Sequence, residues 1–255
     1  MSLVDSLVDA VTALPSPLLI ALDFDGVLSP IVPVPSEARP LPRTAEAVRA
    51  LASAPDTTVV MVSGRGLADL AAVSGFVEPV RMVGSHGGEF GPGLADGDAS
   101  LLTAEQQGLK EKLTQALTDL VDGAAGVALE DKPAGVAVHV RNAEPEVGER
   151  VLAAVREGPV TWAGVDSIEG KAVIDLAVLQ ATKGTAVEAL RERLGAAAVL
   201  FAGDDTTDET VFRSLRPGDV GIKVGDGDTA ATHRVADPAE LADVLAALAR
   251  ARLPA

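Results

Sequence analysis

Carboxylate side chains are concentrated in two short motifs that lie far apart in the chain. The first holds Asp23 and Asp25 directly after an apolar run, and the second follows another apolar run with Asp204, Asp205 and Asp208. Carboxylates this close repel one another unless a cation lies among them, and oxygen ligands without a nearby His or Cys suit Mg²⁺. Alone, each motif has a simpler interpretation as a polar turn after a strand or the acidic first turn of a helix. Together they predict a magnesium site if they meet in space.

Two further polar residues have positions that suit the binding of an anion. Ser63 follows an apolar run and opens a Ser-Gly-Arg turn, and Lys183 opens an amphipathic stretch. Backbone N–H groups at the start of a helix bind phosphate oxygens, and a lysine neutralises phosphoryl charge. Alone, each residue is more often a helix cap or a solvated side chain. Because all four signals fall at strand ends or helix starts, we expect them to converge on one site.

The elements that must position these residues alternate between strands and helices in the first and last parts of the chain. Continuous apolar runs are typical of strands buried on both faces of a parallel sheet. Such runs occur at residues 18–22, 58–62, 80–83, 198–202 and 220–224. Amphipathic stretches follow them at short spacing, which predicts a doubly wound α/β sheet. In that architecture ligands bind beyond the carboxyl ends of the strands, where the polar motifs fall.

The middle of the chain has a different order of elements, in which each of two helices is followed by two strands. The expected strands lie near residues 127–131, 135–141, 160–163 and 171–178. This order predicts a self-contained α+β insert at residues 104–178. Residues 1–103 and 179–255 then form one catalytic core domain.

Composition limits the classes of partner. The chain has 255 residues, 47% hydrophobic and 23% charged, which is typical of a soluble globular protein with room for two domains. With 21 Lys+Arg against 37 Asp+Glu, the net charge is −16, and no basic stripe points to nucleic acid. No apolar run reaches the roughly 18 residues of a membrane span, and Asp5 and Asp9 interrupt what would be a signal peptide. We expect a cytoplasmic monomer or weak oligomer that binds neither nucleic acid nor membranes.

The order of the polar motifs resembles that of the haloacid dehalogenase (HAD) superfamily of phosphotransferases. Within that superfamily the sequence is similar to the trehalose-6-phosphate phosphatases over nearly the whole chain. The segments that carry this similarity are Leu22–Val32 (LDFDGVLSPIV), Val62–Arg65 (VSGR), Gly84–Glu89 (GSHGGE), Glu130–Pro133 (EDKP), His139–Arg141 (HVR), Gly170–Lys171 (GK) and Gly203–Glu209 (GDDTTDE). The resemblance implies a HAD-like core with an inserted cap domain, a Mg²⁺ cofactor and a small-molecule sugar phosphate as substrate.

The resemblance also suggests roles for the residues in the polar motifs. Asp23 would attack phosphorus and form an aspartyl-phosphate, while Asp25 would protonate the departing sugar oxygen and then activate water. Ser63 and Lys183 would hold the phosphoryl oxygens. The expected metal ligands are Asp23, the backbone carbonyl of Asp25 and Asp204, with Asp205 and Asp208 acting through water or neighbouring groups.

A second group of residues is expected to bind the sugar. In the expected strand at 135–141 apolar and polar side chains alternate, so that one face packs and the other presents His139 and Arg141. Charged side chains suit the hydroxyls of a sugar. Surface ion pairs, which contribute little, are the alternative interpretation of the charged residues, but the family similarity favours sugar binding for Glu130, Lys132 and Arg141. For His86 and His139, a structural hydrogen bond is an equal alternative to a sugar contact. The expected substrate-binding residues are Arg65, His86, Glu130, Lys132, His139, Arg141, Lys171 and Asp175.

The sequence departs from the family pattern at three positions. Val27 stands where relatives commonly have Thr, Asp175 where they often have Glu, and Thr182 where they often have Asp. The shorter Asp175 side chain bears on the geometry of substrate binding. The main hypothesis is hydrolysis of trehalose 6-phosphate, the last step of trehalose biosynthesis. The alternatives are a HAD phosphatase for a related sugar phosphate (sucrose phosphate, or a glucosyl- or mannosyl-phosphoglycerate) and a non-catalytic regulator that binds a sugar phosphate.

Overall fold

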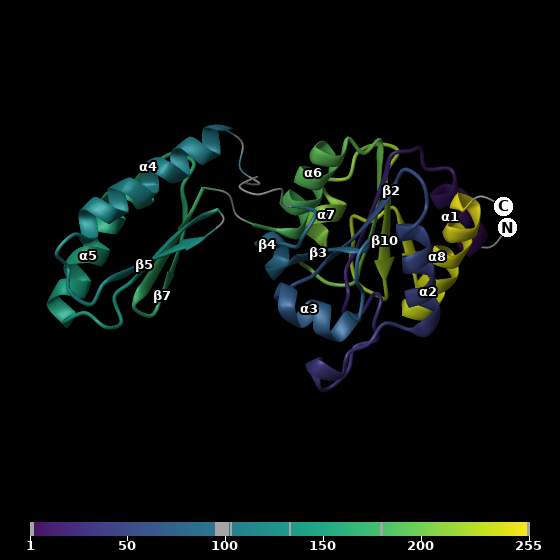
Figure 1. The fold of residues 1–255 in the computed structure, drawn as a ribbon, viewed down its shortest axis with the longest axis horizontal. Helices are drawn as coiled ribbons and strands as arrows, with labels where there is room; N and C mark the ends of the chain where they lie inside the picture. Colours follow the sequence, from purple (N-terminus) through teal and green to yellow (C-terminus); the bar gives the residue numbers. More distant parts are fainter. Residues whose placement is uncertain (1–2, 95–101, 103, 133, 179–180, 254–255) are drawn as a thin grey trace. The chain divides into compact units, whose positions relative to one another are not determined.

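The structure of the chain forms two compact units (Figure 1), and each is described here by itself. It is a computed structural model that describes residues 3–94, 102, 104–132, 134–178 and 181–253. The first unit comprises Met1–Gly97 and Thr182–Ala255, and the second comprises Asp98–Ala181. The domain limits expected at residues 103 and 179 lie outside the described residues.

A seven-stranded sheet forms the centre of the first unit, in the order β11-β10-β9-β1-β2-β3-β4. Its strands are β1 (Leu18–Leu22), β2 (Thr57–Val62), β3 (Arg81–Gly84), β4 (Glu89–Phe90), β9 (Ala198–Gly203), β10 (Val220–Val224) and β11 (His233–Val235). All neighbouring strands are parallel except β3 and β4. The expected α/β architecture with a parallel sheet is therefore confirmed.

Helices cover both faces of this sheet (Figure 1). They are α1 (Leu3–Thr12), α2 (Pro42–Ala52), α3 (Leu67–Ser74), α6 (Lys183–Leu194), α7 (Glu209–Phe212) and α8 (Pro238–Arg252). Side chains alternate across a strand, so β1 contributes to two cores. Leu18, Ile20 and Leu22 pack with α1, α2, α3 and α8, while Leu19 and Ala21 pack with α6 and α7. Strand β1 is buried along its whole length as a result.

The register of the central strands decides where the polar motifs lie. Leu22, the last residue of β1, is opposite Met61 of β2 and Ala202 of β9. The residues that follow these three strands therefore leave the sheet side by side at its carboxyl edge. Asp23, Ser63 and Asp204 are brought to one place although they are far apart in the sequence.

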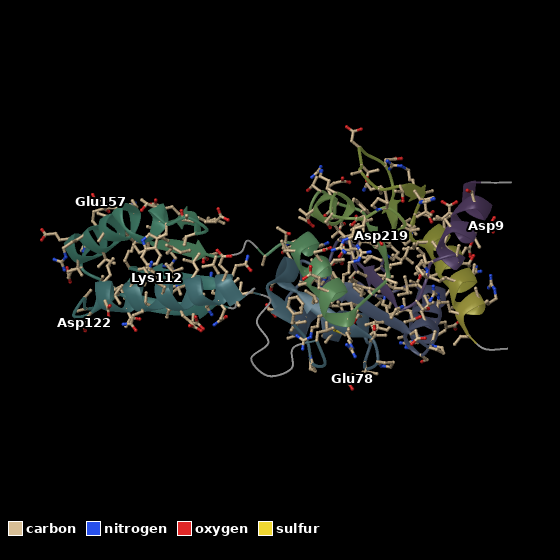
Figure 2. The ribbon with its side chains drawn as sticks, turned by 90° about the horizontal axis from the view of Figure 1, so that it is seen from above. Asp9, Glu78, Lys112, Asp122, Glu157 and Asp219 are labelled. Atoms are coloured by element: carbon tan, nitrogen blue, oxygen red, sulfur yellow. The ribbon has the colours of Figure 1, made fainter. Side chains whose placement is uncertain are left out.

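A buried ion pair fixes α6 against the sheet. Nη1 of Arg191 donates to Asp219 Oδ2 over 2.8 Å. The Asp219 carboxylate also accepts the backbone N–H groups of Val199 (2.9 Å) and Arg216 (2.7 Å). Asp219 is labelled in Figure 2, and its side chain is 2% exposed. Because α6 begins at Lys183, this anchor helps to position that lysine.

The second unit packs two helices on one face of an antiparallel sheet of order β5-β6-β8-β7. Its elements are α4 (Ala104–Val121), β5 (Ala128–Lys132), β6 (Gly135–His139), α5 (Pro145–Glu157), β7 (Asp166–Gly170) and β8 (Val173–Ala177). Val136, Val138, Ile174 and Leu176 point toward the helices and are buried with them in one apolar core. The order of helix, two strands, helix and two strands agrees with the sequence pattern.

One strand expected in the second unit is wrongly placed. Residues 160–163 were expected to form a strand, but a 3-10 turn covers Pro159–Thr161, and β7 follows at Asp166–Gly170. The apolar signal arises because Trp162 packs against the core and stacks with Lys112, whose Nζ lies 4.9 Å from the ring centroid. Strand β7 is exposed throughout at the sheet edge, so its sequence lacks the apolar alternation of a packed strand.

Among the residues that the structure describes, no helix has the length and apolar character needed to cross a membrane.

Candidate active site

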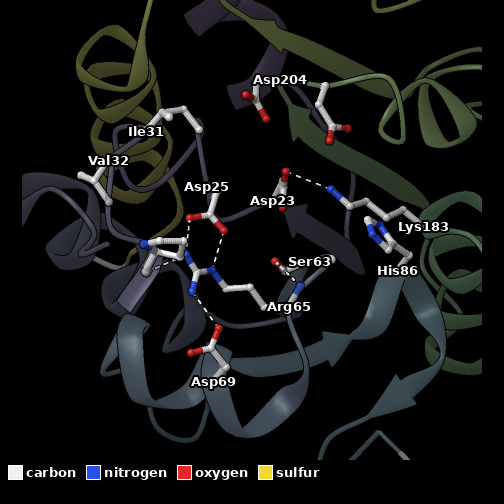
Figure 3. Close-up of a pocket in the computed structure, with 13 residues that line it drawn as sticks. Asp23, Asp25, Ile31, Val32, Ser63, Arg65, Asp69, His86, Lys183 and Asp204 are labelled. Carbon is white, nitrogen blue, oxygen red and sulfur yellow. Dashed lines mark hydrogen bonds and ion pairs between the residues drawn. The ribbon is translucent and has the colours of Figure 1, made fainter. Parts of the chain in front are cut away.

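The carboxyl edge of the central sheet contains a cavity of about 520 Å³ (Figure 3). Its lining residues are Asp23, Asp25, Ile31, Val32, Pro35, Ser63, Gly64, Arg65, Asp69, His86, Lys183, Asp204 and Asp205. The structure thus brings together the catalytic candidates, both parts of the expected metal site, and two of the expected substrate-binding residues, Arg65 and His86.

Lys183 links the two acidic motifs. Its Nζ lies 2.9 Å from Asp23 Oδ2 and 2.8 Å from Asp208 Oδ1, and all three side chains are buried. Burial alone would lower the pKa of Lys183, but the two carboxylates raise it above its ordinary value. Burial raises the pKa of Asp23, against the opposing effect of Lys183. At Asp23, the cost of burial therefore outweighs the attraction of the neighbouring lysine.

Asp208 organises the acidic loop from within. Its Oδ2 accepts the backbone N–H groups of Asp204 (2.8 Å) and Asp205 (3.0 Å), while its Oδ1 accepts from Lys183. Asp208 is fully buried, and a Cβ on Gly203 would come within 2.4 Å of its Cγ. Only glycine at that position allows so close an approach. The carboxylate of Asp208 thus shapes the loop that carries Asp204.

Asp205 has a similar local role. Its Oδ1 accepts the N–H (2.7 Å) and the hydroxyl (2.6 Å) of Thr207. Partial burial raises the pKa of Asp205, but these hydrogen bonds contribute to a pKa that is lowered overall. Asp205 is therefore already committed as a hydrogen-bond acceptor within the loop.

The carboxylates fit a divalent cation. Oxygen atoms of Asp23, Asp204 and Asp208 lie within 4.8 Å of one another. Burial, together with the charges of Asp208 and Asp205, raises the pKa of Asp204 to about 6. A cation beside these oxygens would offset both effects, and a set of hard oxygen donors is what Mg²⁺ prefers.

Gly26 allows the first acidic motif to approach the second. Its φ is +75°, a conformation that favours glycine, and a Cβ there would lie 2.0 Å from Asp204 Oδ2. The turn after β1 therefore packs directly against the Asp204 carboxylate. No other residue type would permit this arrangement without moving one of the two motifs.

Arg65 is bound to the first acidic motif. Its Nε donates to Asp25 Oδ2 over 2.6 Å and its Nη2 to Asp25 Oδ1 over 2.8 Å. Nη2 also donates to the carbonyl of Pro35 (2.8 Å), and Nη1 donates to Asp69 Oδ2 (2.7 Å). The sequence suggested that Arg65 contacts substrate. It did not indicate that these protein partners would occupy the Arg65 guanidinium.

Ser63 and His86 belong to two turns that interlock. The N–H of His86 donates to the carbonyl of Ser63 over 3.0 Å, and a Cβ on Gly64 would come within 2.5 Å of the His86 ring. His86 has φ +55°, which is uncommon for a residue other than glycine and is stabilised here by its contacts. Glu89 braces the same turn by accepting from the Ser85 hydroxyl and the Leu67 N–H, and these bonds lower the pKa of Glu89.

Lys223 is a residue of the site that the sequence interpretation missed. It is buried at the end of β10, and its Nζ donates to the backbone carbonyls of Asp204 and Val224. Its charge opposes the rise in the pKa of Asp204. The available signal was a single lysine within the apolar run 220–224.

Four expected sugar-binding residues meet on the sheet of the second unit. The charged face, as we call it, consists of Glu130, Lys132, His139 and Asp175. Lys132 Nζ pairs with Asp175, and His139 Nε2 lies 2.8 Å from Glu130 Oε2. Glu130 and Asp175 both pair with Ala137 of the central strand β6, which places them on the same side of the sheet.

Arg141 and Lys171 lie elsewhere in the second unit. Strand β6 ends at His139 and β8 begins at Val173, so the alternation does not extend to either residue. Both line a separate cavity of about 580 Å³ together with Arg156, Glu169 and residues of α5. Their expected role in substrate binding stays a prediction.

These features define a class of protein. A paired-aspartate motif follows a central parallel strand, Ser63 and an acidic loop follow the neighbouring strands, and Lys183 begins a helix, which is the arrangement expected from the resemblance to the HAD superfamily. The family model described as Trehalose-phosphatase matches residues 21–244, and the chain belongs to this family.

Relatives and solved structures agree with that assignment. The trehalose-phosphate phosphatase of Mycobacterium marinum is 35% identical over 240 residues, covering 89% of this chain and 60% of that protein. The bifunctional trehalose-6-phosphate synthase/phosphatase of Thermoproteus tenax is 33% identical over 222 residues, covering 86% of this chain and 30% of that protein. The chain therefore spans less than two thirds of the length of either relative.

The fold is that of a solved family structure. The trehalose-6-phosphate phosphatase of Aspergillus fumigatus superposes with a TM-score of 0.64 and covers 97% of each chain at 24% identity. This likeness supports the fold described above.

Proposed function

We propose that this chain hydrolyses trehalose 6-phosphate to trehalose and phosphate. The observation that carries the proposal is the position of Asp23 in the cavity, with Lys183 at 2.9 Å and the acidic loop beside it. Membership of the trehalose-phosphatase family supplies the substrate. A carboxylate held beside a buried cation suits attack on a phosphoryl group.

The proposed chemistry has two steps. In the first, an oxygen of Asp23 forms a bond to phosphorus, the bond from phosphorus to the sugar oxygen breaks, and Asp25 gives that oxygen a proton. In the second, a water oxygen bonds to phosphorus, the bond to Asp23 breaks, and Asp25 takes the proton of the water. General acid–base catalysis contributes about 10²–10⁴ in rate. Ser63 and Lys183 hold the phosphoryl oxygens in both steps.

The proposed metal ligands are Asp23, Asp204 and the backbone carbonyl of Asp25. The Asp23 and Asp204 carboxylate oxygens lie within 4.8 Å of each other, and such hard oxygen donors fit Mg²⁺, which when bound would supply positive charge that offsets the repulsion between Asp23 and the phosphate. Asp208 and Lys223 hold the loop that carries Asp204.

The charged face of the second unit is the proposed recognition element for the sugar. A sugar hydroxyl both donates and accepts, so carboxylates and cations in alternation can bind several hydroxyls at once. The side chains of the charged face are between 35% and 56% exposed and can exchange a protein partner for a ligand. This assignment is consistent with the family similarity around Glu130 and His139.

A substrate panel tests the proposal. Phosphate release from trehalose 6-phosphate, sucrose 6-phosphate and glucose 6-phosphate is measured with Mg²⁺ and with EDTA. We expect turnover of trehalose 6-phosphate alone, abolished by EDTA and restored by Mg²⁺. Preference for sucrose 6-phosphate would indicate a related sugar phosphatase, and tight binding without turnover would indicate a regulator. Full activity in EDTA would contradict the metal assignment.

A further inference from the structure

The cavity at the carboxyl edge of the central sheet has an apolar margin. Among the described residues that line it, the apolar side chains are those of Ile31, Val32 and Pro35, which we call the apolar rim. They belong to the loop that follows the first acidic motif. Figure 3 shows Ile31 and Val32 on the side of the cavity opposite Lys183 and His86. One side of the cavity therefore offers apolar contacts to a ligand.

The Ile31 side chain is directed into solvent at this margin. Its exposed fraction is 71%, whereas its neighbour Val32 packs against the core of the first unit. An apolar side chain left in water forgoes the free energy of burial. Single exposed apolar residues are common on protein surfaces, so exposure by itself indicates no function. Ile31 is distinguished by its position in the lining of the candidate active site.

The loop that carries Ile31 is restrained at both ends. Ser29 and Ala38 are fully buried, and the N–H of Leu41 donates to the carbonyl of Leu28 over 3.0 Å, which closes the base of the loop. Three prolines between the two buried ends restrict the backbone further. A restrained loop loses less entropy when a ligand binds. Ile31 is therefore presented to the cavity before any ligand arrives.

Hydrogen bonds place the loop beside the first acidic motif. Nη2 of Arg65 donates to the carbonyl of Pro35 and to Asp25 Oδ1, each over 2.8 Å. The N–H of Gly26 donates to the carbonyl of Ser29, also over 2.8 Å. In the proposed reaction Asp25 lies beside the departing sugar oxygen. The carbon atoms next to that oxygen therefore come to the part of the cavity where the apolar rim lies.

We propose that Ile31 binds the C–H groups of the sugar next to the phosphate and thereby contributes to the affinity for substrate. This inference rests on the proposed function and adds to it a contact that charged side chains do not supply. Sugar hydroxyls take polar partners, but the C–H groups of the ring gain free energy when they leave water for an apolar surface. In small-molecule sites, apolar side chains supply contact area while polar groups fix orientation.

Steady-state kinetics with trehalose 6-phosphate and Mg²⁺ test the proposal. We compare the wild type with Ile31→Ser and also measure inhibition by inorganic phosphate, which carries no sugar. For Ile31→Ser we expect KM to rise about tenfold, at the low end of the effect of a lost apolar contact in a pocket. The kcat and the inhibition constant of phosphate should change less than about twofold, because the contact is made by the sugar in the ground state and the transition state alike.

An isosteric pair of variants separates apolarity from size. Ile31→Val and Ile31→Thr introduce side chains of the same shape, of which only the second carries a hydroxyl. We expect Ile31→Val to keep most of the affinity of the wild type and Ile31→Thr to resemble Ile31→Ser. Equal KM values in Ile31→Val and Ile31→Thr would overturn the inference, and so would an unchanged KM in Ile31→Ser.

Val34→Ser is the matched control. Val34 lies in the same loop and is 46% exposed, but it is not one of the described residues that line the cavity. The control should behave as the wild type. An equal rise of KM in Val34→Ser and Ile31→Ser would overturn the inference, since the loop as a whole would then be responsible. A rise in the phosphate inhibition constant that matches the rise in KM would also overturn it, because the phosphate part of the site would then be changed.

Light scattering tests whether the apolar rim instead binds a second copy of the chain. A wild-type oligomer that Ile31→Ser converts to monomers would overturn the inference. Circular dichroism checks folding, and if Ile31→Ser does not fold, the comparison of Ile31→Thr with Ile31→Val decides the question. A wild type that releases no phosphate contradicts the proposed function and this inference with it, whereas an active wild type with an unaffected Ile31→Ser contradicts this inference alone.

Discussion

The cavity of the first unit and the charged face of the second use the same types of side chain but hold them differently. In the cavity, Lys183 is 2% exposed and each of its two carboxylate partners has further hydrogen bonds. On the charged face, the Lys132 and Asp175 side chains are 36% and 35% exposed and pair mainly with each other.

This difference has an energetic meaning. Buried charges interact strongly and become costly when one partner is lost, so the cavity is organised before any ligand arrives. Exposed ion pairs contribute between about 0 and 1 kcal/mol, so they exchange partners easily. This difference fits the proposed function, in which the cavity of the first unit supplies the chemistry and the charged face of the second supplies the selectivity.

The largest expected effect is the loss of the nucleophile. Asp23→Asn should lower phosphate release from trehalose 6-phosphate about 10³-fold or more, because an amide does not form the aspartyl-phosphate. The variant should keep the circular dichroism spectrum of the wild type. Near-normal turnover would contradict the proposed role of Asp23. It would also contradict the assignment of the chemistry to the cavity.

Lys183→Met should cause the largest loss of stability. Removing the lysine leaves Asp23 and Asp208 buried without their shared cation, and breaking a buried pair in this way costs about 3–5 kcal/mol. Urea unfolding with and without the substitution measures this difference. A change below about 1 kcal/mol would show that the cavity is no better organised than an exposed ion pair.

Gly26→Ala should loosen the contact between the two acidic motifs. The new Cβ would lie 2.0 Å from Asp204 Oδ2, and the backbone φ of +75° adds strain of about 1–3 kcal/mol. We expect weaker Mg²⁺ binding by calorimetry. Gly195→Ala is the matched control, because Gly195 has φ +60° and nothing within 4 Å of a Cβ. Equal Mg²⁺ binding in the two variants would exclude a specific role for the Gly26 contact.

Lys132→Met should have the smallest effect on stability and a selective effect on activity. Its exposed pair with Asp175 is worth less than about 1 kcal/mol. If Lys132 binds the sugar, KM for trehalose 6-phosphate should rise about tenfold, with a smaller change in kcat. Lys110→Met removes another lysine–aspartate pair of the same unit, with Asp131, and serves as control. An unchanged KM would argue against sugar binding by the charged face.

Much of the first unit could be predicted because its strands are buried on both faces. The central strands lie within a residue or two of the apolar runs that predicted them, from β1 at Leu18–Leu22 to β10 at Val220–Val224. Burial on both faces requires a continuous apolar run, and a run this short is more typical of a strand than of a helix. The polar residues after these runs were placed at the cavity for the same reason.

The second unit was harder to predict because its strands have only one buried face. The apolar segment around Trp162 was mistaken for a strand, and the exposed edge strand β7 was missed. Alternation along 135–141 correctly placed His139 but not Arg141, since the strand ends between them. Where a strand ends depends on its partners in the sheet, which a local pattern does not contain.

The order of apolar runs and polar residues in the chain was enough to predict a parallel sheet with Asp23, Ser63 and Asp204 at its carboxyl edge. That information is local, because burial and side-chain period act on neighbouring residues. The partners of each charged group were decided only by tertiary structure. Hydrogen bonds from Arg65 to Asp25 and from Lys223 to the Asp204 carbonyl join residues distant in the chain. Such contacts depend on strand register and loop packing.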